Sequence, residues 1–107
     1  MITTTTDGID GRSVTGYLGI VSGEAIMGAN IIKDFLASVR DIVGGRAGSY
    51  EKTLKDAKIA AIEDMIEEAK DLGADAIVGV DLDYEVIGGD EKTMLLVSAN
   101  GTAVKLG

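Results

Sequence analysis

The chain has 107 residues, close to the commonest size of a single domain, so we expect one domain covering residues 1–107. Its formal net charge of −8 makes nucleic acid and anionic membrane surfaces unfavourable partners, because both carry negative charge. The absence of Cys and His removes thiolate chemistry, disulfides and the commonest metal ligand, which excludes most catalytic and soft-metal sites.

The first residues, MITTTTDGID, have neither the basic start nor the apolar stretch of a secretory leader. No apolar run in the chain approaches the roughly 18 residues that a membrane-spanning helix needs. We therefore expect a soluble cytoplasmic protein.

Two β-strands are predicted before residue 28. The β-branched residues 2–6 and the partly alternating residues 13–21 have strand-like patterns, and two Asp-Gly pairs lie between them. This arrangement predicts a first β-hairpin. Glycines recur at positions 16, 19, 23 and 28, and glycine inside a strand is typical of a bulge or of close backbone contact.

Two helices are expected next. Residues 29–43 repeat apolar side chains with helical spacing, and Gly44-Gly45 provides a stop. A short link leads to a longer helix, for which Ser49 is the predicted N-cap and Gly73 the predicted end. The short link favours packing of the two helices as a hairpin.

The longer helix has an unusually wide apolar surface. Its apolar side chains cover an arc of about 200°, roughly twice the width that a core-facing helix needs. One side should pack on a sheet, and the remaining arc, with Ile59, Ile62 and Ile66, should face the first helix or another subunit. We therefore expect a homo-oligomer.

A clear strand pair follows the longer helix. Residues 76–86 alternate strictly, with Ala76, Val78, Val80, Leu82, Tyr84 and Val86 on one face. A turn centred on Gly89-Asp90 would return the chain along residues 93–105, with Leu82 opposite Val97. The second face of this pair mixes polar and apolar residues, so we expect it to border a neighbouring subunit or a pore.

The predicted order is therefore β-β-α-α-β-β. This order indicates an α+β domain, a two-layer α/β sandwich in which an antiparallel sheet packs on the long helix.

Four segments together resemble a known family: GIVSGEAIMGAN (19–30), DIVGGRAGSYE (41–51), LGADAIVGVDLDYE (72–85) and NGTAVKL (100–106). In this order they are similar to the YbjQ-like family, and the likeness covers essentially the whole chain. The resemblance implies a dodecin-like subunit, a homopentamer or stacked pentamers, and a function described only as "putative heavy-metal-binding".

One candidate ligand site lies at the start of the longer helix. Glycines before a helix N-terminus can hold an anion, Arg46 adds positive charge, and Tyr50 and Glu51 follow in the first turn. The spacing is not that of a P-loop, and an ordinary turn with Tyr50 packed inward is the simpler interpretation. Lys58 lies within the apolar arc and either extends its ammonium to water or pairs with Glu24, Glu51 or a neighbouring subunit.

The candidate metal ligands are Asp81, Asp83 and Glu85, which we call the acidic row. They share one strand face at intervals of about 7 Å and could supply oxygens to Ca²⁺ or Mg²⁺, although a solvated strand face is the simpler interpretation. Soft metals would lack their preferred ligands. The sequence identifies no cofactor.

Three functions remain open. The first hypothesis is a non-catalytic, ring-forming oligomer that binds a small ligand or ion in a pore or inter-subunit pocket. The alternative is an enzyme with carboxylate, Tyr and Lys groups at the interface, which a buried carboxylate pair with a raised pKa would favour. An adaptor for another protein would require an exposed apolar patch left after assembly.

Overall fold

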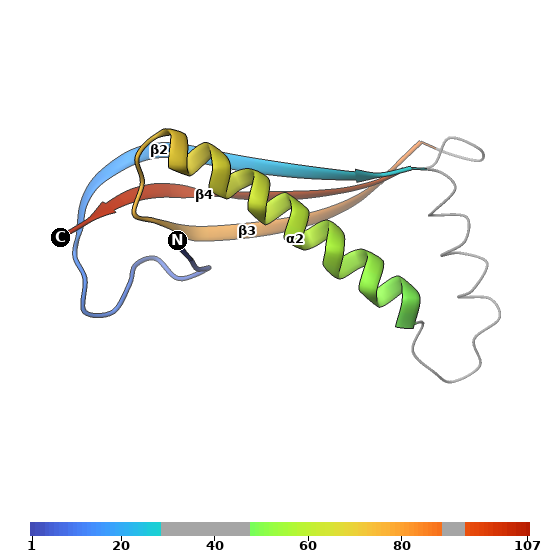
Figure 1. Ribbon diagram of the computed structural model, residues 1–107, viewed down its shortest axis with the longest axis horizontal. Helices are drawn as coiled ribbons and strands as arrows, with labels where there is room; N and C mark the ends of the chain where they lie inside the picture. Colours follow the sequence, from blue (N-terminus) through green and yellow to red (C-terminus); the bar gives the residue numbers. More distant parts are fainter. Residues whose placement is uncertain (29–47, 89–93) are drawn as a thin grey trace.

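The computed structural model describes residues 1–28, 48–88 and 94–107, and shows one long helix lying across one face of a sheet (Figure 1). The elements are β1 (Ile2–Thr3), β2 (Val14–Met27), α2 (Gly48–Asp71), β3 (Ala76–Ile87) and β4 (Met94–Leu106). The chain is therefore a two-layer α+β domain, as expected. The predicted first helix, residues 29–43, lies outside the described residues. Within the described residues, no helix is long and apolar enough to cross a membrane.

The four-stranded sheet is mixed, so the prediction of a purely antiparallel sheet is wrong. Its order is β1-β3-β4-β2, and β1 runs parallel to β3 while the other pairs are antiparallel. The predicted first hairpin does not form, because Ile2 pairs with Ala76 of β3. One edge of β2 is occupied along its length by β4, and side chains of α2 bond its other edge. The short first strand therefore extends the sheet at β3.

The strand pair after the helix forms with a different register. Leu82 lies opposite Ala99, two residues from the predicted partner Val97. Because side chains alternate with a period of two, this shift leaves the predicted face of β4 unchanged. Leu95, Val97, Ala99 and Ala103 all pack in the core beneath the helix, as expected.

The predicted alternation of β3 fails at Gly79. The register shifts between Val78 and Asp81, and Gly79 has a φ of 61°, which favours glycine. Before this bulge Ile77 faces the helix, whereas Ala76 and Val78 pack on the opposite side of the sheet. The prediction that Ala76 and Val78 share a face with Leu82 is therefore wrong.

The core lies between α2 and the sheet and is made of small aliphatic side chains. The buried stripe of α2 is Ala57, Ala61, Met65 and Ala69. The closest approach is at Gly23 of β2, where a Cβ would collide with backbone atoms of Ala61 and Met65. The irregularities in β2 occur at Val14 to Gly19, which confirms the predicted bulge in the glycine-rich strand.

The helix ends as the sequence predicts. Gly73 has a φ of 77°, and its N–H donates to the carbonyl of Lys70 at 2.9 Å. The N–H of Ala74 donates to the carbonyl of Ala69 at 3.0 Å, which completes a Schellman stop. At the other end the helix begins at Gly48, so Ser49 lies within the helix and not before it.

Candidate functional site

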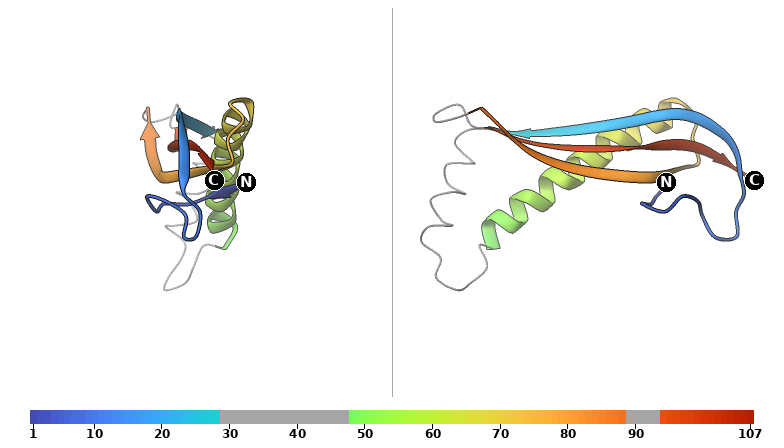
Figure 2. Two further views of the ribbon diagram at one scale, coloured as in Figure 1. Left: turned by 90° about the vertical axis from the view of Figure 1, so that its left-hand side faces the viewer. Right: turned by 180° about the vertical axis from the view of Figure 1, so that it is seen from behind.

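The face of the sheet turned away from α2, here called the open face, carries the three candidate metal ligands Asp81, Asp83 and Glu85. Seen along the strands, α2 lies on one side of the sheet (Figure 2). One end of the open face is covered, because Ile9 packs there against a cluster of Ala76, Val78 and Val104. Elsewhere on this face the side chains of the outer strands are mostly exposed and those of β4 are mostly half-buried.

Large apolar side chains of β2 lie on the open face. Tyr17, Ile20 and Ile26 are 76%, 80% and 63% exposed. Each lies across from a residue of β4 whose side chain also points away from the helix. The sequence analysis expected a mixed surface here from the residues of β4, but it did not place the apolar side chains of β2 beside them.

The acidic row lies on this face beside polar residues of β4. Asp81 is opposite Asn100, and Asp83 is opposite Ser98. On its other side Ser98 is opposite Glu24 of β2, so a transverse line of Glu24, Ser98 and Asp83 crosses three strands. The sequence pattern contained these residues, but only the antiparallel register aligns them.

Two carboxyl groups of the row interact directly. A hydrogen bond with Asp81, together with the charge of Asp81, raises the pKa of Asp83, and Glu85 contributes less. Asp81 thus disfavours the ionised form of Asp83. Among the described residues, no three Asp, Glu, His or Cys side chains are grouped as a metal ion would require. The described part of one subunit therefore offers two neighbouring carboxyl groups and not a complete coordination shell.

The proposed anion-binding residues lie elsewhere. Arg46 is outside the described residues, and of Tyr50 only the position in α2 is described. Glu51 and Lys58 lie on α2, in the layer opposite the acidic row, so the two candidate sites do not combine. Lys58 is half-buried, and no ion pair to it occurs within the described residues. This position suits a lysine with a covered stem and a solvated head.

Two surface pockets lie away from the predicted site residues. One, of about 610 Å³, is lined by Met1 and by residues of α2 that include Asp64 and Ile66. The other, of about 260 Å³, is lined by the N-terminal residues Ile2 to Asp10. Neither pocket includes the acidic row or Lys58.

Comparison with known proteins decides the family. The family model described as "Putative heavy-metal-binding" matches residues 1–107. The chain belongs to the YbjQ-like family. The resemblance seen in the four sequence segments is thereby confirmed.

Two known proteins are similar over the whole chain. A UPF0145 protein of Bacillus thuringiensis subsp. konkukian (strain 97-27) is 58% identical over 106 residues, which cover 99% of this chain and 100% of that protein. A crystal structure of a protein of unknown function from the DUF74 family of Pediococcus pentosaceus matches with a TM-score of 0.62 at 20% identity. That match covers 100% of this chain and 98% of the other, and it supports the fold alone.

Proposed function

We propose that this protein is a non-catalytic, cytoplasmic homo-oligomer that binds a hard divalent cation through carboxylates of β3. The homopentamer of dodecin-like subunits implied by the family resemblance is the assembly that we propose. The observation that carries the proposal is the exposed apolar surface of β2, where Tyr17, Ile20 and Ile26 all face solvent. Several large exposed apolar side chains on one strand face favour an interaction site, although Ser22 and Glu24 lie between Ile20 and Ile26.

The position of the apolar side chains favours a ring. Ile59 of α2 is 49% exposed and lies in the layer opposite the open face, so an exposed apolar side chain is present on each layer of the subunit. Contact between unlike surfaces is head-to-tail, and such contacts close into a ring when the rotation permits. Of the three helix residues predicted at subunit contacts, Ile59 is exposed, whereas Ile62 and Ile66 pack against the core beneath the helix.

The carboxyl pair supports cation binding. Asp81 raises the pKa of Asp83, and a divalent cation that prefers oxygen ligands would offset the repulsion between the two carboxylates. The whole chain lacks His and Cys, so Zn²⁺ and Cu²⁺ would find only carboxylates. Because one subunit provides two adjacent carboxyls, water or a symmetry-related subunit would complete the shell.

The catalytic alternative gains no support from this pair. A buried carboxylate pair in a cleft would favour an enzyme, but Asp81 and Asp83 are both exposed. The pKa of Asp83 is raised mainly by the neighbouring acid and not by burial. An open, solvated face also does not exclude water from a reaction.

Native mass spectrometry tests both parts of the proposal. We expect a single oligomer at a multiple of the 11.1 kDa subunit mass, with Ca²⁺ or Mg²⁺ retained after chelator treatment and readdition. Ile20→Lys with Ile26→Lys should reduce the oligomer, whereas Thr5→Lys in the exposed N-terminal loop should not. A monomer at micromolar concentration would refute the assembly. Tight Zn²⁺ binding that survives Asp81→Asn with Asp83→Asn would refute the cation site.

A further inference from the structure

Among residues 1–28, 48–88 and 94–107, no strand lies beside the outer edge of β3 over most of its length. β1 pairs only with Ala76 and Ile77. The following threonines continue as far as the bulge, where the N–H of Gly79 donates to the carbonyl of Thr6 at 2.8 Å and that of Val80 donates to Thr4 at 3.0 Å. Within the described residues, β3 from Asp81 to Ile87 pairs only with β4.

The direction of the free backbone groups follows from the opposite edge of the sheet. The N–H groups of Ser22 and Glu24 donate to carboxylates of α2, so they point away from β4. In an antiparallel pair, two residues that lie opposite each other direct their backbone groups either both toward each other or both away. Asn100 and Ser98 of β4, which lie opposite Ser22 and Glu24, therefore direct their backbone groups toward β3. The N–H and C=O groups of Leu82, Tyr84 and Val86 must then point outward, away from β4.

This edge has a different chemistry on each face. Tyr84 and Val86, 49% and 69% exposed, lie on the side of the helix. Asp81, Asp83 and Glu85 lie between them on the open face. Alternate side chains of a strand added here would point to opposite faces of the sheet. One set would lie beside the apolar side chains and the other set beside the carboxylates.

We propose that the β3 edge binds an extended segment of another protein in which Lys or Arg alternates with apolar residues. Strand addition derives affinity from main-chain hydrogen bonds and specificity from alternate side chains. The apolar side chains of the segment would lie beside Tyr84 and Val86, and its basic side chains beside Asp83 and Glu85. This role is additional to the assembly and cation binding proposed above.

A second copy of the chain does not suit the edge. Two N–H groups in the middle of the β2 edge are already bonded, Ser22 to Glu68 at 3.4 Å and Glu24 to Asp64 at 3.1 Å. Two β3 edges paired antiparallel about Tyr84 would place Asp83 opposite Glu85 of the other copy, and like charges in that position are destabilising. The net charge of −8 further favours a basic partner.

A synthetic peptide of alternating Lys and Val tests the proposal by fluorescence anisotropy and amide hydrogen exchange. We expect saturable binding and new protection of the Leu82, Tyr84 and Val86 amides. Tyr84→Pro should weaken binding about tenfold, because it removes the outward N–H that would bond the peptide. That N–H points away from β4, so the substitution removes no hydrogen bond between β3 and β4. Tyr84→Ala keeps that N–H and is the matched control, with a smaller loss.

Variants of the peptide test the proposal on the unaltered protein, so the result does not depend on whether the proline variant folds. An N-methylated peptide with the same charges and a peptide with Glu in place of Lys should both fail to bind. Equal binding of the N-methylated peptide would show attraction by charge alone and would overturn strand addition. Absence of saturable binding would do the same, as would amides of β3 that are already protected in the protein alone.

Discussion

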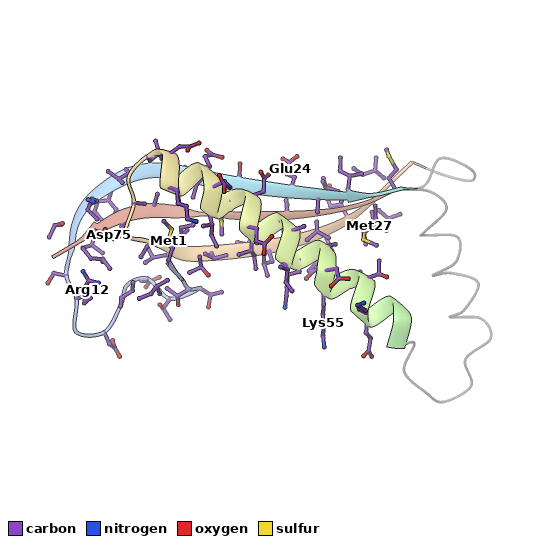
Figure 3. All side chains as sticks on the ribbon, in the orientation of Figure 1. Met1, Arg12, Glu24, Met27, Lys55 and Asp75 are labelled. Atoms are coloured by element: carbon purple, nitrogen blue, oxygen red, sulfur yellow. The ribbon has the colours of Figure 1, made fainter. Side chains whose placement is uncertain are left out.

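The backbone N–H of Glu24 donates a hydrogen bond to a carboxylate oxygen of Asp64 at 3.1 Å (Glu24 is labelled on β2 in Figure 3). A side chain of the helix thus occupies the outer edge of the sheet that the same helix covers. The N–H of Ser22 is bonded in the same way by Glu68. Such bonds satisfy edge groups that would otherwise be available to other strands.

The residue between these two bonds determines how closely the helix can approach. Gly23→Ala would place a methyl group against the backbone of Ala61 and Met65, which cannot rotate away. We expect a loss of about 1–3 kcal/mol in the free energy of unfolding, measured by chemical denaturation. Gly16→Ala is the matched control in the same strand, since its methyl group would make only ordinary contact with Lys105. Equal effects of the two substitutions would contradict the close approach.

The edge bonds predict a specific change in hydrogen exchange. Asp64→Ala should accelerate exchange of the Glu24 amide and reduce stability by about 1 kcal/mol, because one charge-assisted hydrogen bond is lost. Asp64→Asn retains an acceptor oxygen and should have a smaller effect. Glu63→Ala removes a neighbouring exposed carboxylate and serves as control. Unchanged exchange at Glu24 in the alanine variant would be inconsistent with the bond.

Asp75 should make stability depend on pH in the acid range. Its carboxylate accepts the N–H of Leu106 at 2.9 Å and the ammonium of Lys105 at 3.4 Å (Figure 3 labels Asp75). The Leu106 hydrogen bond, with help from the charge of Lys105, lowers the pKa of Asp75 below its ordinary value of 3.8. In acid the folded state then binds fewer protons than the unfolded state. The contribution of Asp75 to folding stability is therefore fully present above the ordinary pKa and is lost as pH falls through the folded pKa.

Asp75→Asn measures this contribution. Denaturation of the variant between neutral and acid pH should show lower stability at neutral pH and a weaker decline on acidification. Asp7→Asn removes the same charge from an exposed loop and is the control. A variant with the pH profile of the original protein would rule out the role of Asp75.

The Asp81–Asp83 pair should give folding stability the opposite dependence on pH. The hydrogen bond and charge of Asp81 raise the pKa of Asp83, so the folded state binds more protons than the unfolded state. This stabilisation is complete below the ordinary value of 3.8 and is lost as pH rises through the raised pKa. Asp83→Asn should therefore raise the denaturation midpoint at neutral pH and change it little in acid. Glu85 contributes less to the raised pKa of Asp83, so Glu85→Gln should raise the midpoint at neutral pH by less than Asp83→Asn does. A larger rise with Glu85→Gln would disprove the role of Asp81 and Asp83.

Local sequence patterns alone predicted the main elements. The alternation after residue 76 and the helical period after residue 48 depend on neighbouring residues, which decide whether a segment can bury one face. Gly73 was recognisable as the end of α2 because a positive φ there is a local requirement. The acidic row could also be found, since residues two apart in a strand share a face.

Only the tertiary structure decided which strands pair and which residues meet across them. The first strand could bond to β2 or to β3, and the outcome depended on β4 and on carboxylates of α2 that lie far away in the sequence. The bulge at Gly79 turned Ala76 and Val78 to the other face, because the N-terminal segment provides hydrogen bonds and apolar cover there. The alignment of Glu24 with Asp83 likewise follows from register. Pairing and register are set by competition among distant backbone groups, and a local pattern contains no information about that competition.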